Sequence, residues 1–271
     1  RIRTSVGYVG EAQPPSIIII MKGVFMSKIK LQSISASSRW LQCSASLKYN
    51  QSFTENVHTL KGNLIHNVSA LRLREVFFNE NHTVEKLKNE KYVSQKDPNL
   101  FATWDNDCEK TSEGYVNYAI KLNKQYTPHT IEIEKKQWLK WYDYDKYGYV
   151  DLLMISDDYI IIVDLKTGRG AVDTEENTQM LLYAIGVIQE YTKKNNKAFG
   201  GKYILSIYQP LINNTQAFEY SLGQISQFYA SKREKMNEII TGELKYDPST
   251  TACKWCDYRD SCNERIKKGV I

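Results

Sequence analysis

The sequence has no apolar stretch long enough to cross a membrane. Its longest apolar run near the N-terminus covers only residues 16–21, whereas a membrane-spanning helix needs about 20 residues. No signal-peptide cleavage pattern accompanies that run. We therefore expect a soluble, cytoplasmic protein with no membrane partner.

Cysteine is scarce, with five residues in a chain of 271. An odd number in so long a chain argues against a secreted scaffold held by disulfides. There is also no internal repeat and no linker long enough to require a second domain. A composition of 42% hydrophobic and 25% charged residues argues against disorder or a fibre. The formal charge of +5 would suit a polyanionic partner, but such an excess is common in proteins that bind nothing acidic.

The first 25 residues look detached from the rest. They lack an initiator methionine, and a Pro-Pro turn precedes the stretch Met-Lys-Gly-Val-Phe-Met. We expect residues 1–25 to be a non-native or disordered leader, read from a purine-rich ribosome-binding site ahead of a true start at Met26. The alternative is a short β-forming arm.

Periodicity divides the remaining chain into helices and strands of an α/β protein. Helical spacing of apolar residues predicts helices over residues 64–78, 113–126, 177–195 and 225–244, the last closed by Gly242. Alternating or continuous apolar runs predict strands over residues 129–142, 147–155, 157–167 and 201–212, the last ended by Pro210. The first three strands would form a meander. Residues 33–49 read as a loop or short helix.

Charged residues interrupt two of these apolar strands. Asp164 and Lys166 are two residues apart, so their side chains share one face of a strand. Asp151, on the neighbouring strand, can converge on the same place in an antiparallel pair. Two carboxylates suit Mg²⁺ or Mn²⁺, and the lysine can orient a water or neutralise charge on a phosphate. The alternative is a surface salt bridge at a strand end.

Three further polar side chains lie on the predicted helices. Gln179 and Tyr183 are four residues apart, so they share a helical face directly after the strand of Asp164. His66 lies near the first turn of an earlier helix, where a lone histidine is commonly structural. Upstream, Glu132 and Glu134 share a strand face, but alternating strands routinely expose such acids, and we expect both to be structural.

Together these motifs resemble the PD-(D/E)xK nuclease superfamily, in particular its RecB-like branch. The matching segments are Gly148-Tyr-Val-Asp151, Val163-Asp164-Leu-Lys166-Thr-Gly168, Gln179-Met-Leu-Leu-Tyr183 and Gly62-Asn-Leu-Ile-His66. This chain has Asp rather than the commoner Glu before x-Lys, and Val in place of a small polar residue two positions after Gly148. Neither departure removes a ligand.

The resemblance implies a restriction-endonuclease-like core, with a mixed central sheet flanked by helices. It also implies a metal-dependent phosphodiesterase, in which His66, Asp151 and Asp164 bind the metal ion. Lys166 would assist the attacking water. Gln179 and Tyr183 would hold the active site and the DNA strand.

The remaining pattern is a C-terminal cysteine cluster. Cys253, Cys256 and Cys262 lie close together in the sequence, whereas Cys43 is far upstream. Zinc sites normally use two close pairs, while an iron–sulfur cluster needs no paired spacing. The one-plus-three layout resembles the 4Fe–4S staple of AddB-type and CRISPR-associated nucleases. The alternatives are a zinc knuckle or reduced, unligated thiols. Cys108 falls outside the pattern and is expected to be a free thiol.

From residue 35 to residue 265 the order of motifs resembles a phage and prophage family of RecB-like proteins. The resemblance implies one nuclease domain over residues 26–271, active in the host cytoplasm in recombination or replication. The expected activity is that of an exonuclease on single-stranded DNA ends, working as a homo-oligomer or with a recombination partner. The alternatives are a catalytically silent nucleic-acid-binding protein of the same fold, or a zinc-binding phage structural protein.

Overall fold

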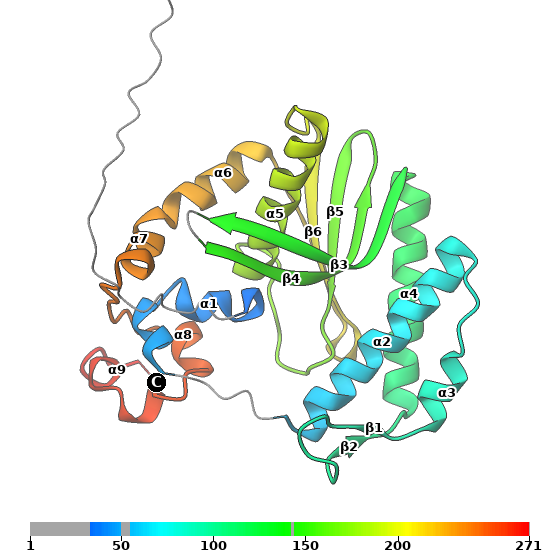
Figure 1. Cartoon of the computed structure of the whole chain (residues 1–271), viewed down its shortest axis with the longest axis horizontal. Coiled ribbons are helices and arrows are strands. Elements are labelled where there is room, and N and C mark those ends of the chain that lie inside the picture. The colour runs from blue at the N-terminus through cyan, green and yellow to red at the C-terminus, as the bar shows by residue number, and fades with distance from the viewer. Residues whose placement is uncertain (1–32, 50–54, 142–143, 271) are drawn as a thin grey trace, which may run out of the picture.

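The protein is built around one five-stranded mixed sheet with helices on both faces (Figure 1). The computed structural model describes residues 33–49, 55–141 and 144–270. The expected leader, residues 1–25, therefore lies outside the described residues. No helix in the described part of the chain combines the length and the apolar character needed to span a membrane.

The strands of the sheet lie in the order in which they occur along the chain. They are β3 (Thr130–Trp141), β4 (Tyr144–Ile155), β5 (Tyr159–Leu165), β6 (Lys202–Gln209) and β7 (Asn214–Tyr220). Neighbours pair antiparallel, except that β5 and β6 are parallel. That one parallel pair requires a crossover, which the helix α5 (Thr178–Asn195) supplies.

Two apolar cores lie on opposite faces of the sheet. In β5, Ile160 and Ile162 belong to the core that packs against α5, while Ile161 and Val163 belong to the core on the other face. That other face is covered by α2 (Val57–Phe78) and α4 (Asn106–Tyr126). Because alternate residues of a strand point to opposite faces, burial on both faces accounts for the continuous apolar run in the sequence.

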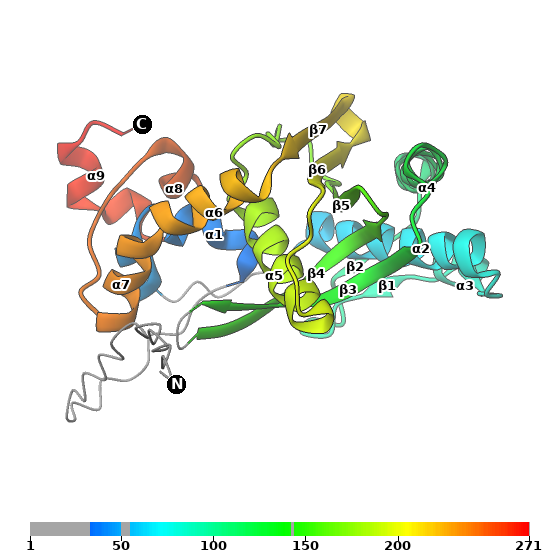
Figure 2. The ribbon, with the colours of Figure 1, turned by 90° about the horizontal axis from the view of Figure 1, so that it is seen from above.

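The smaller elements gather at the two ends of the molecule (Figure 2). Beside α2 lie α3 (Val84–Asn89), β1 (Tyr92–Val93) and β2 (Phe101–Ala102). At the opposite end lie α1 (Ser37–Trp40), α6 (Leu222–Ser231), α7 (Arg233–Thr241), α8 (Thr250–Lys254) and α9 (Asn263–Lys267). Short 3₁₀ turns cover Ile34–Ala36, Ser44–Lys48, Pro210–Ile212 and Arg259–Ser261.

The sequence predicts this architecture well. The mixed central sheet flanked by helices, with a cysteine-rich C-terminal segment, is confirmed, as is the antiparallel meander of β3, β4 and β5. The fourth predicted strand ends before Pro210, as expected. The helix predicted over 64–78 begins earlier, at Val57, because the Asn56 side chain accepts the Thr59 N–H and caps it.

Two expectations need correction. The single helix predicted over residues 225–244 is two helices, because Lys232 has φ −93° and ψ 1°, which is not helical. Gly242 does end the second helix, in the left-handed conformation. Strand β7 is not anticipated by the sequence pattern. Its hairpin with β6 turns through the short 3₁₀ segment after Gln209, and Asn213, at φ 53°, leads into it.

Candidate active site

Two acidic residues project from the sheet where the ladder between β3 and β4 is interrupted. Ile133 pairs with Leu152 and Lys135 pairs with Val150, so Glu134 and Asp151 lie opposite each other between these two pairs. Glu134 has φ 50°, in the left-handed region, which costs an L-residue roughly 1–2 kcal/mol. Such strain tends to persist at functional sites.

At this interruption, the side chains of β4 change the face of the sheet to which they point. Val150 packs into the core beside α5, whereas Leu152 packs into the core beside α2. Strict alternation would place both residues on one face. The local twist therefore turns the carboxylates of Glu134 and Asp151 toward α2.

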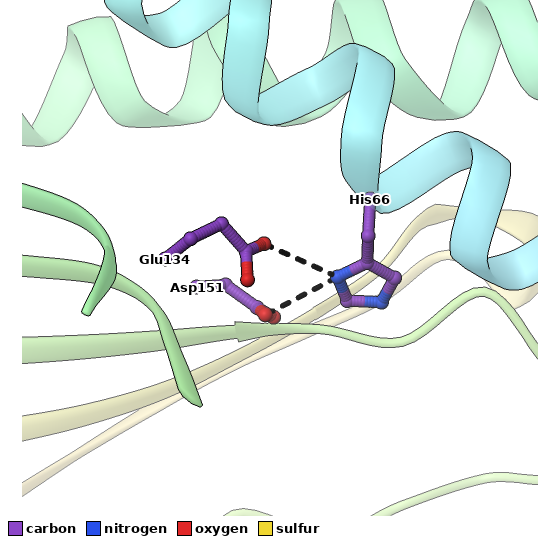
Figure 3. Close-up of side chains that lie close together, drawn as sticks. All are labelled: His66, Glu134 and Asp151. Carbon is purple, nitrogen blue, oxygen red and sulfur yellow. Dashed lines mark ion pairs between the residues drawn. The ribbon is translucent and has the colours of Figure 1, made fainter. Parts of the chain in front are cut away.

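Helix α2 supplies a histidine to this pair (Figure 3). His66 Nδ1 lies 3.2 Å from Asp151 Oδ1 and 3.9 Å from Glu134 Oε1. Within the described ranges, these three residues form the one set of three His, Cys, Asp or Glu residues whose ligand atoms all lie within 4.8 Å of one another. One nitrogen and two carboxylates can together hold a divalent cation.

A glycine lets α2 approach closely enough for this contact. Gly62 lies one helical turn before His66, and a Cβ at that position would lie 2.9 Å from Thr167 Oγ1. Thr167 directly follows Lys166 in the chain. A larger residue at position 62 would therefore require either the Thr167 side chain or the helix to shift.

Asp151 is fixed by the backbone of the next strand. Its Oδ2 accepts a 2.6 Å hydrogen bond from the N–H of Leu165, which lies between Asp164 and Lys166. The other oxygen faces His66. The side chain is 10% exposed, so the carboxylate is held in one orientation with little access to water.

Asp164, Lys166 and Gln179 form a closed triangle of two hydrogen bonds and one ion pair. Lys166 Nζ lies 2.9 Å from Asp164 Oδ2 and donates to Gln179 Oε1, also at 2.9 Å. The amide of Gln179 donates in turn to Asp164 Oδ1 at 2.7 Å. One glutamine therefore positions both the acid and the amine, because its amide carries a donor and an acceptor.

Tyr183 lies one turn beyond Gln179 on α5 and packs against Gly148. A Cβ on Gly148 would lie 2.7 Å from Tyr183 Cε1 and 2.8 Å from its hydroxyl oxygen. The ring is 4% exposed, and it borders the same cavity as His66 and Glu134. This cavity has a volume of about 680 Å³ and opens between α2 and the β3–β4 hairpin.

The crowded carboxylates shift the pKa values of their neighbours. Burial, and then the Asp151 carboxylate, raise the pKa of Glu134 to about 7. Burial alone would lower the pKa of His66, but Asp151 and then Glu134 raise it to about 9. Burial also raises the pKa of Asp164. The site thus concentrates negative charge in a buried place, which a divalent cation would neutralise.

Lys166 remains an ammonium in these surroundings. Burial acts to lower its pKa, but the Asp164 carboxylate more than offsets this effect and raises the pKa above its ordinary value. At neutral pH the side chain therefore donates hydrogen bonds and carries a positive charge. It is poorly suited to accept a proton.

All six residues expected at the site come together around this cavity and the triangle behind it. Expected metal ligands His66 and Asp151 are adjacent, while Asp164 is engaged by Lys166 and Gln179. Glu134 was expected to be structural, yet the structure places it in the carboxylate cluster. No glycine or asparagine marks its left-handed conformation in the sequence, and the polar run Glu-Lys-Lys-Gln is the one local sign of a break.

The four cysteines of the expected cluster meet in a second place. Cys43, Cys253, Cys256 and Cys262 line one small cavity, together with Tyr49, Tyr246 and Tyr258. All four are free thiols, as is Cys108, which is buried within α4. The Cys43 sulfur accepts the N–H of Asp247 at 3.4 Å. The one-plus-three spacing in the sequence therefore does correspond to a spatial cluster.

A buried arginine accompanies the thiols. Arg39 is 3% exposed, and its Nη1 donates to the carbonyl of Trp255 at 2.9 Å. Burial lowers its pKa, while the charges of Cys256, Asp257 and Cys43 act to raise it. Burial raises the pKa of the Cys256 thiol, and the positive charge of Arg39 acts against this rise. The thiolate is the form that binds metals, so Arg39 favours metal binding at Cys256.

Comparison with known proteins adds a family and two distant structures. A family model described as "Protein of unknown function (DUF2800)" matches residues 30–270. The crystal structure of a "putative exonuclease" from Eubacterium rectale is 10% identical, with a TM-score of 0.46 over 88% of this chain and 94% of that one. The structure of SSO0001 is 12% identical, with a TM-score of 0.31 over 86% of this chain and 97% of that one. Both likenesses are too distant to bear on activity.

Proposed function

This chain belongs to the DUF2800 family, and we propose that it is a metal-dependent nuclease that hydrolyses phosphodiester bonds in DNA. The observation that carries the proposal is the convergence of His66, Glu134 and Asp151 beside the triangle of Asp164, Lys166 and Gln179. A binding protein has no chemical need for several buried acids next to a lysine. Phosphodiester hydrolysis needs both, because negative charge develops on the phosphate during the reaction.

The residues fit a hard divalent cation, Mg²⁺ or Mn²⁺. His66, Glu134 and Asp151 would hold the ion, and Asp164 is close enough to act electrostatically on His66. The bound ion would polarise a phosphate oxygen and make a bound water more acidic. An imidazole among the oxygen donors favours Mn²⁺ more than Mg²⁺, because imidazole suits transition metals and Mg²⁺ prefers oxygen.

Lys166, Gln179 and Tyr183 would position the reacting groups and stabilise the charge that develops on the phosphate. Lys166, as an ammonium, would orient the attacking water and neutralise charge on the scissile phosphate. Gln179 keeps the amine in place through its 2.9 Å hydrogen bond and holds Asp164 with the other end of its amide. Tyr183 forms a rigid wall of the cavity against which the DNA backbone would lie.

The proposed substrate is the end of a single DNA strand, with exonuclease action favoured over endonuclease action. Support comes from the sequence resemblance to RecB-like phage and prophage nucleases and from the open cavity beside the acids. The corresponding role would be recombination or replication in a host cytoplasm, as a homo-oligomer or with a recombination partner. The domain would cover residues 26–271.

We further propose that the four clustered cysteines bind a 4Fe–4S cluster. The four cysteines line one cavity, and their one-plus-three layout suits an iron–sulfur cluster because its ligands need no paired spacing, whereas zinc sites normally use two close pairs. The N–H of Asp247 would stabilise the Cys43 sulfur, and the charge of Arg39 would stabilise the Cys256 sulfur.

The test of the nuclease proposal is cleavage of end-labelled single- and double-stranded DNA by anaerobically purified protein, with Mn²⁺, Mg²⁺ or EDTA. Lys166→Ala is compared with Lys202→Ala, a matched control on a half-exposed lysine at the start of β6. We expect metal-dependent cleavage that Lys166→Ala abolishes and Lys202→Ala retains. Folded protein that binds DNA and cuts no substrate would instead favour the silent binding protein.

A further inference from the structure

The β3–β4 hairpin extends beyond the rest of the sheet next to the candidate active site (Figure 1). Strand β4 pairs with β5 only between Leu152 and Ile155, while its pairing with β3 continues to Tyr144. Within the described chain, the outer half of β4 therefore pairs with β3 alone. This outer half leads directly from Asp151 away from the sheet.

The two faces of this arm differ in character. On one face Leu139, Trp141 and Val150 are buried in the core beside α5. The opposite face carries Lys136 and Trp138 from β3, with Tyr147 and Tyr149 from β4. Tyr149 lines the same cavity as His66 and Glu134, so this face is continuous with the active site.

The three rings of this face are open to solvent. Trp138 is 47% exposed, Tyr147 is 42% exposed and Tyr149 is 51% exposed. The centroids of Trp138 and Tyr147 are 5.0 Å apart, and those of Tyr147 and Tyr149 are 6.0 Å apart. Three exposed aromatic rings in one row form an unusual surface, because large apolar side chains are normally exposed singly.

The row also carries positive charge. Lys136 Nζ lies 4.0 Å from the centre of the Tyr147 ring and 4.8 Å from the centre of the Trp138 ring. Lys136 takes part in none of the ion pairs found among the described residues. Its ammonium therefore remains available to a phosphate. Tyr147 and Tyr149 also line the cavity that contains His66 and Glu134.

We infer that Trp138, Tyr147 and Tyr149, with Lys136, form an aromatic platform on which bases of a single nucleic-acid strand stack while its backbone enters the active site. The inference rests on the proposed function and adds the means by which the substrate is held. A strand rises about 3.4 Å per residue, so Tyr149 lies roughly 7 Å along the chain from Asp151. A base stacked on Tyr149 would therefore be close to the scissile phosphate.

The chemistry of the platform selects a single strand. Every base has a π-face that can stack on an aromatic ring, so stacking tolerates any sequence. In a duplex these faces are covered by neighbouring base pairs. A protein partner or a second copy of the chain could also cover exposed rings, but neither would account for a basic aromatic row that leads into the cavity of His66 and Glu134.

The test is the affinity of the full chain for a labelled oligothymidylate, measured by fluorescence anisotropy in EDTA so that no cleavage occurs. Each stacked base is worth about a 5- to 150-fold change in affinity on alanine substitution. We expect Tyr149→Ala to weaken binding by a factor in that range and Tyr147→Ala with Tyr149→Ala to weaken it further. Tyr149→Phe keeps the ring and should bind like the wild type.

The matched control is Phe78→Ala, which removes an equally exposed ring at the far end of α2, 45% exposed. It lies about 18 Å along the helix from His66 and should leave affinity unchanged. Thermal melts of all variants verify folding, which the exposed positions should not disturb. Quenching of Trp138 fluorescence by the oligonucleotide, lost in Trp138→Phe, gives a second readout of stacking.

The two proposals fail in different ways. If the wild type cleaves single strands while the double alanine variant binds and cleaves equally well, the platform is refuted and the nuclease stands. If the alanine variants lose binding but the wild type cuts nothing, the platform stands and the nuclease is refuted. An equal loss of affinity for a blunt duplex would also overturn the platform, because no base face is available there.

Discussion

Replacing Glu134 with glutamine should make the metal-free protein more stable and the metal-bound protein less so. Burial and the Asp151 carboxylate raise the pKa of Glu134 from 4.5 to about 7. Ionising this side chain in the folded protein is therefore unfavourable, by about 3 kcal/mol if the full difference is counted. The side chain is 30% exposed, so solvent screens part of the effect, and we expect about 1–3 kcal/mol.

The sign of this effect depends on pH. Because the folded protein binds the proton more tightly than the unfolded chain, stability is lost as pH rises from 4.5 to about 7 and stays low above that. Glutamine removes the loss. In EDTA at pH 8, Glu134→Gln should melt about 2–10 °C higher than the wild type, and the difference should vanish below pH 4.5.

The assay is thermal unfolding of both proteins, each in EDTA and in Mn²⁺. Mn²⁺ should raise the melting temperature of the wild type much more than that of Glu134→Gln, because the variant lacks one charged ligand. Glu132→Gln is the control: it removes a neighbouring glutamate that is paired with Lys135, outside the His66 cluster. If Glu134→Gln gains no stability in EDTA and responds to Mn²⁺ like the wild type, Glu134 is not part of a metal site.

Three further predictions follow from single contacts. Metal affinity should rise between pH 6.5 and about 9, because His66 must lose the proton that its carboxylate neighbours stabilise before it can bind the metal. Metal binding should therefore release protons, and calorimetry in two buffers of different ionisation enthalpy measures the number released. Gly148→Ala should destabilise the protein by about 1–3 kcal/mol and impair cleavage, because its Cβ would lie 2.7 Å from Tyr183, whereas Gly168→Ala, with nothing within 4 Å, should do neither. Cys256→Ser should lose visible absorption and melt at a lower temperature, because an iron–sulfur cluster closes the long loop between Cys43 and the C-terminal cysteines. Cys108→Ser is the control and should keep its colour. An unchanged colour in Cys256→Ser would refute the cluster.

Much of the fold and the site could be predicted because the informative residues lie in regular elements. The pairs Asp164 with Lys166 and Gln179 with Tyr183 follow strand and helix periods, so their shared faces could be derived from spacing. Glu134 could not be predicted, because its place in the site depends on a left-handed backbone in the middle of a strand. The break at Lys232 could not be predicted because no glycine or proline marks it in the sequence. Strand β7 could not be predicted although Pro210 lies in the turn before it, because its sequence Asn-Thr-Gln-Ala-Phe-Glu-Tyr has few apolar residues.

The most direct test of the central claim is a parallel titration of Mn²⁺ binding and single-strand cleavage. Binding is followed by electron paramagnetic resonance, and single-turnover cleavage is measured on the same samples of the wild type and Asp151→Asn. The proposed site predicts that both curves of the wild type rise over the same Mn²⁺ concentrations and that both are lost in the variant. Mn²⁺ bound at the site without any cleavage, or cleavage that survives in Asp151→Asn, would contradict a nuclease built on His66, Glu134 and Asp151.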